Sequence, residues 1–465
     1  MRTLEWLIVA VLAVYAVAPG FRWRSWLPLA GLALVAAHLA TENYRWQMVP
    51  LYVVVALLAA LNVTRLLRGK TKPSGGWRRW AGPVAGIVAV LLLSAPPVLF
   101  PVPHLPAPGG PYKIGTVTFE WTDASRPEPN TPAPDDNRKI VVQVWYPALP
   151  GVGRMVGSIT APWLDHLSVV GPHIATYLGL PSFFLDHAVL VKTNDYFDAS
   201  VDPSGGTYPV VIYSHGWNGF RDVNLDQSEA LASHGYIAVA IDHPYGAMVT
   251  AFADGTVALN NPDLLPKGVS ADVFQTASEA VEATYAADIR FALDQLEKIN
   301  SGAIDSPLAG KLDLSRVGVY GHSTGGGATV VFCAADPRCK AALGMDPWLG
   351  PVPDAVIRAG LKQPYLAMMS QTWSTPANTA KLDTLLAANA GDSAKLTIAG
   401  TSHFDFTMLP LLTPLAPALG LKGPIDGERG MAINTAYLVA FFDHTLKGTG
   451  SVNLTGYPEV TFEAR

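Results

Sequence analysis

The chain has 465 residues, of which 49% are hydrophobic and only 15% are charged, and its formal net charge is −5. This balance favours a membrane-associated region joined to a soluble domain over a wholly soluble enzyme. Residues 1–104 carry ten Lys and Arg against two Asp and Glu, a net of +8, and the remainder carries 22 against 35, a net of −13. The acidic remainder argues against nucleic acid as a partner. The basic N-terminal region is typical of a chain that meets an anionic lipid bilayer.

Apolar stretches near the N-terminus predict a transmembrane region of about four helices over residues 1–103. The stretches are 6–21, 26–40, 48–63 and 80–100. The first three lie at or below the length of a span, so the second could instead be a buried or re-entrant helix, and the first a cleaved signal peptide.

Basic residues set the expected orientation of this region. Six of them separate the third and fourth stretches, which predicts that the loop is cytoplasmic; they are Arg65, Arg68, Lys70, Lys72, Arg78 and Arg79. The fourth helix would then lead out of the cytoplasm, through a Pro-rich linker at residues 104–112. We therefore expect a multi-pass protein of the cell membrane whose following domain is extracytoplasmic.

Residues 113–465 alternate between strand-like and helix-like patterns, which predicts an α/β fold with a mostly parallel sheet covered by helices on both faces. The expected strands are 113–122, 138–147, 209–214, 236–242, 317–320, 340–345, 364–370 and 396–400, and the expected helices include 224–234, 289–299 and 433–446. The insertion at about 149–207 is interpreted as a lid or substrate-pocket segment. The alternative is ordinary packing of helices against the sheet edge.

The strongest functional motif is Gly-His-Ser-Thr-Gly at 321–325, which follows an apolar run and precedes small residues. A serine hydroxyl is a weak nucleophile and must stand on a tight turn where a histidine can reach it, and glycines on both sides relieve the crowding. The motif predicts a nucleophile elbow with Ser323 as the nucleophile. The alternative is a strand-to-helix turn without a catalytic role.

An oxyanion hole is expected upstream of this elbow. The strand 209–214 ends in His-Gly-Trp-Asn-Gly at 215–219. Backbone N–H groups in such a loop can bind a developing oxyanion, so we assign the two donors to Trp217 and to Thr324, the residue after the nucleophile. A plain β-turn remains the alternative for the loop.

The acid and the base should follow the nucleophile in that order. The strand 340–345 delivers Asp346 at its C-terminal end, where active sites of open α/β sheets lie. The strand 396–400 runs into His403. These positions predict the triad Ser323, Asp346 and His403. A turn or helix-cap role for Asp346 stays open, and Asp405 is the rival acid.

The remaining histidines and cysteines carry weaker signals. His215 and His322 adjoin the predicted site and are expected to support it, whereas the pattern assigns no role to His243. The chain has only two cysteines, Cys333 and Cys339, which could form a disulfide in an extracytoplasmic domain. The sequence has neither zinc-like ligand spacing nor a phosphate-binding loop, so we expect no metal and no cofactor.

Taken together, the motifs resemble the platelet-activating factor acetylhydrolase family, the plasma and intracellular type II group of α/β hydrolases. The similarity extends over about residues 111–450 and rests on 214–221, 321–326, Asp346 and the Gly-Thr-Ser-His run at 400–403. The resemblance implies an α/β-hydrolase fold with the triad and the loop donor assigned above. The N-terminal region lies outside it.

The resemblance also implies a carboxylic ester hydrolase that acts in lipid degradation on short-acyl phospholipids. A broad carboxylesterase or polyesterase, and an acyltransferase using the same triad, are the alternatives. A non-enzymatic membrane sensor would require a failed triad position, and none fails in this sequence. Acyl length, head group and oligomeric state are not predicted.

Overall fold

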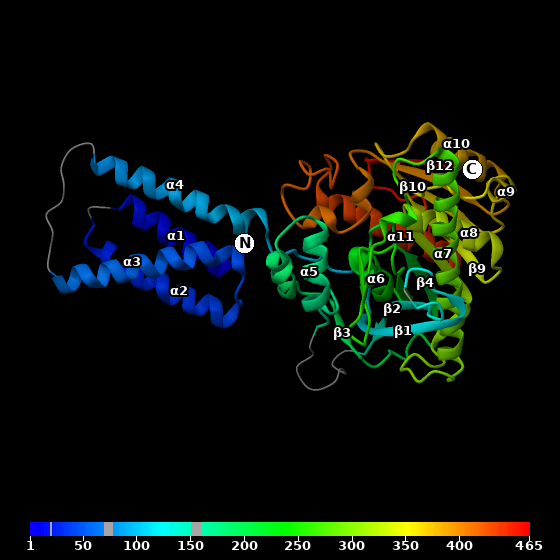
Figure 1. Ribbon diagram of the computed structural model, residues 1–465, viewed down its shortest axis with the longest axis horizontal. Coiled ribbons are helices and arrows are strands. Elements are labelled where there is room, and N and C mark those ends of the chain that lie inside the picture. The colour runs from blue at the N-terminus through cyan, green and yellow to red at the C-terminus, as the bar shows by residue number, and fades with distance from the viewer. Residues whose placement is uncertain (19–20, 69–77, 132, 150–159) are drawn as a thin grey trace. The chain divides into compact units, whose positions relative to one another are not determined.

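The computed structural model describes residues 1–18, 21–68, 78–131, 133–149 and 160–465 and divides the chain into two units (Figure 1). The helical unit comprises Met1–Pro103 with the short segments Leu185–Val191 and Leu412–Leu415. The sheet unit comprises His104–Phe184, Lys192–Leu411 and Ala416–Arg465. Lys70 and Lys72 of the predicted cytoplasmic loop and residues 150–159 of the predicted insertion lie outside the described residues.

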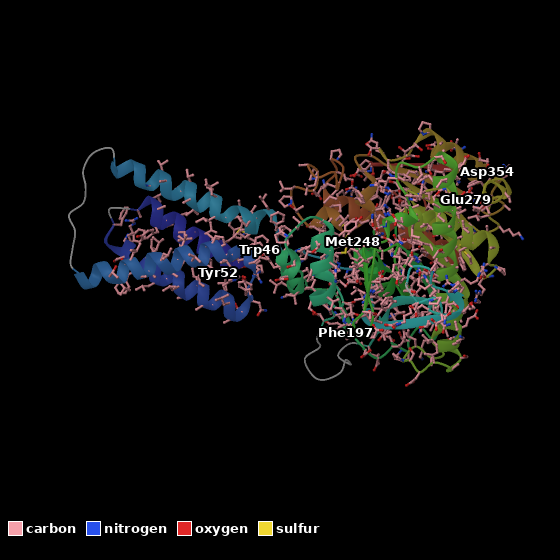
Figure 2. The ribbon with its side chains drawn as sticks, viewed as in Figure 1. Trp46, Tyr52, Phe197, Met248, Glu279 and Asp354 are labelled. Atoms are coloured by element: carbon pink, nitrogen blue, oxygen red, sulfur yellow. A yellow bond between two sulfur atoms is a disulfide. The ribbon has the colours of Figure 1, made fainter. Side chains whose placement is uncertain are left out.

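The helical unit contains four helices where about four spans were predicted. They are α1 (Thr3–Val17), α2 (Leu27–Thr41), α3 (Val49–Arg68) and α4 (Arg78–Leu99), with the 3-10 turns η1 (Arg22–Trp26) and η2 (Trp46–Met48). Apolar side chains such as Ile8, Leu51 and Val55 form the buried centre of the bundle, and Tyr52 packs against them (Figure 2).

Among the described residues of this unit, two segments are long and apolar enough to cross a bilayer, Trp46–Thr64 and Gly82–Leu99. The helices α1 and α2 have 15 residues each. At 1.5 Å per residue they reach about 22 Å, which is less than the hydrocarbon core of about 30 Å. The structure therefore supports a four-helix region but not four spans.

The sheet unit is built on a ten-stranded sheet in the order β12-β11-β10-β9-β8-β4-β5-β2-β1-β3. Its strands are β1 (Lys113–Pro127), β2 (Asn137–Ala148), β3 (Asp195–Phe197), β4 (Tyr208–Ser214), β5 (Ile237–Asp242), β8 (Leu312–His322), β9 (Cys339–Met345), β10 (Tyr365–Ser370), β11 (Ser393–Ile398) and β12 (Val460–Ala464). The six strands from β11 to β5 run parallel, whereas β12, β2 and β1 pair in antiparallel fashion. A hairpin of β6 (Val249–Ala251) and β7 (Val257–Leu259) stands apart.

Helices cover both faces of the sheet because its central strands are apolar on both sides. The helices α6 (Leu225–Ser233) and α11 (Gly427–Lys447) pack on one face, and α7 (Ala271–Asn300) and α8 (Thr324–Ala335) on the other (Figure 1). The sheet unit also contains α5 (Leu167–Tyr177), α9 (Asp354–Ala359) and α10 (Pro376–Ala388). Buried apolar side chains from α7, α8 and the sheet form one core, which includes Val210, Ile212 and Leu293. This arrangement is the predicted α/β-hydrolase fold.

Part of the predicted lid belongs to the sheet instead. Residues 195–197 form β3, which pairs with β1 at the sheet edge, and Val201 bridges to Ala148. Trp163 lies in the interior, where its indole N–H donates to the carbonyl of Asp222 at 3.1 Å. Over residues 195–201 the insertion packs against the sheet edge, and a lid or substrate-pocket role for the segment stays a prediction.

Candidate active site

The elbow forms at the C-terminal end of β8, where Ser323 separates the strand from α8. Ser323 has a φ of 54° and a ψ of −117°, a strained backbone that holds its half-buried side chain out of the turn. The following turn passes close to the oxyanion loop: a Cβ on Gly325 would lie 2.0 Å from the carbonyl oxygen of Ser214. Only glycine fits there, which explains the motif in physical terms.

The predicted acid lies one strand away. Asp346 follows β9 directly and is fully buried. Ser370, at the end of β10, donates its backbone N–H to Oδ1 of Asp346 at 2.7 Å and its hydroxyl to Oδ2 at 2.5 Å. The two bonds fix the plane of the carboxyl group. Sequence reasoning missed Ser370, whose only signal was its place at a strand end beside β9.

The predicted base meets that carboxyl group. His403 begins the 3-10 turn η6 (His403–Phe406), and its Nδ1 lies 3.0 Å from Oδ2 of Asp346. Since a carboxylate can only accept, Nδ1 carries the proton and Nε2 is left as the basic nitrogen. Asp405, the rival acid, instead accepts hydrogen bonds from the backbone N–H groups of Ser402 and Gly423. These bonds stabilise the loop that carries His403.

Two further rings hold His403. The ring of His322 lies 4.3 Å away between centroids, and its Nε2 is 2.9 Å from the carbonyl oxygen of His403. Trp373 also stacks on His403, with ring centroids 4.4 Å apart and ring planes inclined by 11°. Because His322 precedes Ser323 in the chain, its contact brings the elbow and the histidine loop together. Trp373 lies in a loop after β10 and had no recognisable motif.

Burial sets the charge of these groups. It lowers the pKa of His403, so the ring is neutral at neutral pH, as a general base must be. Burial raises the pKa of Asp346, and the hydrogen bonds from Ser370 oppose that rise. Burial and the neighbouring His403 lower the pKa of His322 to about 3, so this ring is neutral too. The site therefore holds one acidic group and two uncharged imidazoles.

The predicted oxyanion donors flank the nucleophile. The loop after β4 packs against the elbow: a Cβ on Gly216 would lie 3.0 Å from Cβ of Ser323. Within the described part of the chain, the N–H groups of Trp217 and Thr324 donate to no protein acceptor. Thr324 opens α8, and the N-terminus of a helix favours negative charge. Both N–H groups are therefore available to a substrate oxygen.

No hydrogen bond joins the hydroxyl of Ser323 to His403 among the residues described. Such bonds commonly tighten only when substrate is bound. The structure thus brings together the elbow, the hydrogen-bonded Asp346–His403 pair and both oxyanion donors at the C-terminal ends of β4, β8, β9 and β11. This arrangement can carry out acyl transfer through a serine nucleophile.

The two cysteines lie away from this group. Cys333 in α8 and Cys339 at the start of β9 form a disulfide, with Cα atoms 5.3 Å apart. It closes the connection between the elbow helix and the strand that carries Asp346.

Among the described residues, Glu5, His38 and Glu42 of the helical unit stand close enough to share an ion. Both oxygens of Glu5 already accept from Arg45, at 2.7 and 2.6 Å, so this cluster is an ion-pair network. We assign no metal to it.

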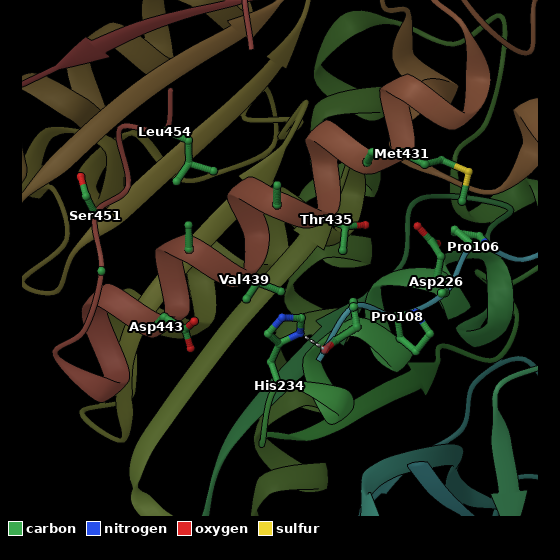
Figure 3. A pocket seen from close by; sticks show the side chains of 17 residues that line it. Pro106, Pro108, Asp226, His234, Met431, Thr435, Val439, Asp443, Ser451 and Leu454 are labelled. Atoms are coloured by element: carbon green, nitrogen blue, oxygen red, sulfur yellow. Dashed lines mark hydrogen bonds between the residues drawn. The ribbon is translucent and has the colours of Figure 1, made fainter. Parts of the chain in front are cut away.

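A cavity of about 500 Å³ also lies apart from the triad, between linker residues 106–109, α6 and α11 (Figure 3). Its wall includes Met431 and Val439, with Asp226 and His234 as polar members. His234 is turned back on its own helix, where Nδ1 lies 2.8 Å from the carbonyl of Ala230. Because neither the triad nor the oxyanion loop lines the cavity, it is not the acyl site of Ser323.

Comparisons with known proteins agree with this geometry. The family model described as platelet-activating factor acetylhydrolase, isoform II, matches residues 103–451. The platelet-activating factor acetylhydrolase of Cavia porcellus is 26% identical over 258 residues, which are 52% of this chain and 58% of that protein. The chain thus spans little more than half the length of that relative.

Two other proteins align over more of the chain. A probable 1-alkyl-2-acetylglycerophosphocholine esterase of Arthroderma benhamiae is 25% identical, over 82% of this chain and 98% of that protein. The solved structure of a ferulic acid esterase from Streptomyces cinnamoneus superposes with a TM-score of 0.63 at 27% identity, covering 78% of this chain and 99% of that one. The family match covers well over half of the chain and contains every predicted site residue, so this chain belongs to the platelet-activating factor acetylhydrolase isoform II family of α/β hydrolases.

Proposed function

We propose that the chain is a membrane-anchored serine hydrolase that removes short acyl groups from phospholipids through an acyl-enzyme. One observation carries this proposal: the buried Asp346 holds Nδ1 of His403 at 3.0 Å, which leaves Nε2 for the serine on the adjacent elbow. A carboxylate that is shielded from solvent, a neutral imidazole and a partly accessible serine on a tight turn are the parts of a nucleophilic acyl-transfer site.

In the proposed mechanism, Nε2 of His403 takes the proton of Ser323 as the serine oxygen attacks the ester carbonyl. The carbonyl oxygen becomes an oxyanion that the N–H groups of Trp217 and Thr324 bind. Asp346 stabilises the imidazolium that forms. His403 then gives its proton to the leaving alcohol. Water repeats the two steps on the acyl-enzyme, releasing the carboxylic acid and free Ser323.

The substrate class rests on the relatives. The name of the fungal protein specifies an acetyl ester of a glycerophosphocholine, and that of the Cavia porcellus protein specifies an acetylhydrolase of platelet-activating factor. We therefore propose a short acyl chain on a phospholipid. A broader carboxylesterase is the second candidate, because the Streptomyces esterase, whose name specifies ferulic acid, aligns with 78% of the chain.

The test is hydrolysis of p-nitrophenyl esters with acyl chains from acetate to palmitate by the detergent-solubilised full chain. Ser323→Ala is the expected inactive variant, and Ser315→Ala, at an exposed serine on the strand β8 that leads to Ser323, is the matched control. Vesicles of 2-acetyl and 2-palmitoyl phosphatidylcholine then separate phospholipid substrates from simple esters. Short-chain activity that depends on Ser323 and extends to the acetyl phospholipid supports the proposal.

Other outcomes point elsewhere. A maximum at palmitate would indicate a lipase, and product that rises with an added alcohol would indicate an acyltransferase. If Ser323→Ala retained the activity of the wild type, the proposed mechanism would be wrong.

The membrane anchor is supported by the two long apolar segments of α3 and α4 and by the net charge of +8 over residues 1–104. An extracytoplasmic catalytic domain agrees with the disulfide Cys333–Cys339, since such bonds persist outside the cytoplasm. Alkaline phosphatase fused after Arg465 should be active in intact cells. An inactive phosphatase, together with a fluorescent green fluorescent protein fusion at the same position, would place the domain in the cytoplasm.

A further inference from the structure

A second Ser–His–Asp chain lies in the interior, directly beneath the oxyanion loop. The hydroxyl of Ser214, the last residue of β4, is 2.9 Å from Nε2 of His243, and Nδ1 of His243 is 2.9 Å from Oδ2 of Asp288 on α7. All three residues are completely buried. They cannot meet a substrate, so these three hydrogen-bonded side chains can affect catalysis only through the residues that they hold in place.

Asp288, the last member of this hydrogen-bonded series, is held as a carboxylate by a neighbouring positive charge. Arg138 donates to both oxygens of Asp288, at 3.2 and 2.7 Å. Burial alone would raise the pKa of Asp288, but the charge of Arg138 keeps it below its ordinary value. The carboxylate therefore accepts from Nδ1 of His243, which makes Nε2 of that ring the acceptor for the hydroxyl of Ser214.

His243 also connects this series of hydrogen bonds to the oxyanion loop after β4. The backbone N–H of His243 donates to Nε2 of His215 at 3.1 Å. A ring nitrogen that accepts carries no proton, so His215, which burial keeps neutral, has its proton on Nδ1. That nitrogen lies 2.7 Å from the carbonyl oxygen of Gly216, to which it donates. A second donor, the N–H of Gly219, reaches the same oxygen at 2.8 Å.

This carbonyl decides where the neighbouring N–H points. In a trans peptide, the C=O of one residue and the N–H of the next point in opposite directions, and the described residues contain no cis peptide. Holding the oxygen of Gly216 inside the loop therefore turns the N–H of Trp217 outward. Gly216 itself packs against Ser323, so this N–H belongs to the part of the loop next to the nucleophile.

We infer that His215, anchored by His243, Ser214 and Asp288, is the positioning residue that aims the oxyanion donor of Trp217. The inference rests on the proposed function, because it requires an oxyanion to form at Ser323. A donor fixed before the reaction stabilises the oxyanion without reorganisation, and loss of one such donor typically lowers kcat by about 10² to 10³.

Two isosteric changes separate the two hydrogen bonds of His215. In His215→Asn the amide nitrogen stands near the position of Nδ1, so the bond to Gly216 can persist while the acceptor for His243 is lost. In His215→Gln the amide oxygen can replace Nε2, but the donor to Gly216 is lost. We expect His215→Asn to stay within about fivefold of the wild type and His215→Gln to lose between ten- and a thousandfold in kcat with little change in KM.

The rate of phosphonylation of Ser323 by a fluorophosphonate gives a readout that needs no known substrate, because its P=O oxygen requires the same donors. This rate should fall in His215→Gln by a factor similar to that in kcat for p-nitrophenyl acetate. Equal losses in both variants, or a loss that follows the melting temperature alone, would show a merely structural role and overturn the inference.

If His215→Gln fails to fold, Ser214→Ala tests the positioning role of His215, because it removes the hydrogen bond from Ser214 to His243. It removes one hydroxyl and leaves the loop residues intact, and we expect a three- to tenfold loss of the phosphonylation rate. Unchanged rates in every folded variant would overturn the inference while leaving the proposed function intact. Fluorophosphonate labelling that persists in Ser323→Ala would instead contradict the proposed function.

Discussion

Trp373 lies face to face with His403, at a centroid distance of 4.4 Å and an angle of 11° between the ring planes. The ring becomes an imidazolium in the proposed mechanism, and an aromatic face attracts a cation by about 0.5–2 kcal/mol. The same indole covers one side of the ring and keeps water from it. We therefore expect Trp373 to stabilise the charged intermediate more than the neutral resting state.

Replacing this indole should slow catalysis. We expect Trp373→Ala to lower kcat by about 3- to 30-fold, because the cation–π stabilisation is lost. Trp373→Phe keeps an aromatic face and should retain most of the rate. Steady-state kinetics on p-nitrophenyl acetate checks both, and an alanine variant as fast as the wild type would show that the stack has no role in catalysis.

The acid limb of the pH–rate profile should depend on Ser370. Protonation of either member of the Asp346–His403 pair removes the base, so kcat/KM falls as the pH drops through the apparent pKa of the pair. The hydroxyl of Ser370 stabilises the anion at 2.5 Å. Without it, Asp346 and His403 both hold a proton more firmly, so Ser370→Ala should move the limb to higher pH by about one unit.

A profile of kcat/KM between pH 4 and pH 9 measures this shift. Ser374→Ala, a nearby serine that bonds to Thr379 instead, serves as the control. A shift of the Ser370→Ala profile to lower pH would contradict the assigned hydrogen bond.

The disulfide should matter for stability and not for chemistry. Cys333 and Cys339 are six residues apart, and closing so short a loop stabilises a protein by about 2 kcal/mol. The double variant Cys333→Ser/Cys339→Ser should melt a few degrees lower and keep the wild-type kcat. Thermal denaturation with and without a reductant tests this, and a reductant that leaves the melting temperature of the wild type unchanged would refute it.

The sheet unit should lose stability as the pH rises. Burial raises the pKa of Asp222 to about 8 and that of Asp226 to about 7, whereas a carboxyl group in an unfolded chain has a pKa of about 3.9. These groups stay protonated in the folded state while the unfolded state ionises. Their stabilising contribution is therefore complete below pH 4 and disappears as the pH rises through 7 and 8.

The variant Asp226→Asn imitates the protonated carboxyl group and should remove part of this dependence. We expect its melting temperature to exceed that of the wild type more at pH 8.5 than at pH 5.5. A constant difference between the two proteins across that range would show that Asp226 does not titrate with folding.

The elements of the triad could be read from the sequence because each lies at the end of an apolar strand, in the order Ser323, Asp346 and His403. Strand, tight turn and helix follow one another locally at the elbow, so no knowledge of distant contacts was needed. The edge strands β3 and β12 could not be foreseen. They have three and five residues and are partly exposed, and their pairing depends on neighbours far away in the chain.

The supporting residues were hidden for a similar reason. The side chains of His243 and Asp288 are separated by 45 residues and meet only in the folded interior. Trp373 and Ser370 likewise act on groups delivered by other strands. In the helical unit, composition alone suggested four spans, but helix length decided otherwise for α1 and α2.

The buried chain Ser214–His243–Asp288 reproduces the hydrogen-bond connectivity of a catalytic triad with distances of 2.9 Å at both links. A search for hydrolase sites by residue type and spacing would return it beside the true one. Ser214, however, ends a regular strand and is sealed from solvent, whereas Ser323 stands on a strained turn and is partly accessible. We therefore expect the reactivity of a serine in this protein to depend on backbone conformation and solvent access. A hydrogen bond from a serine to a histidine does not by itself make that serine a nucleophile.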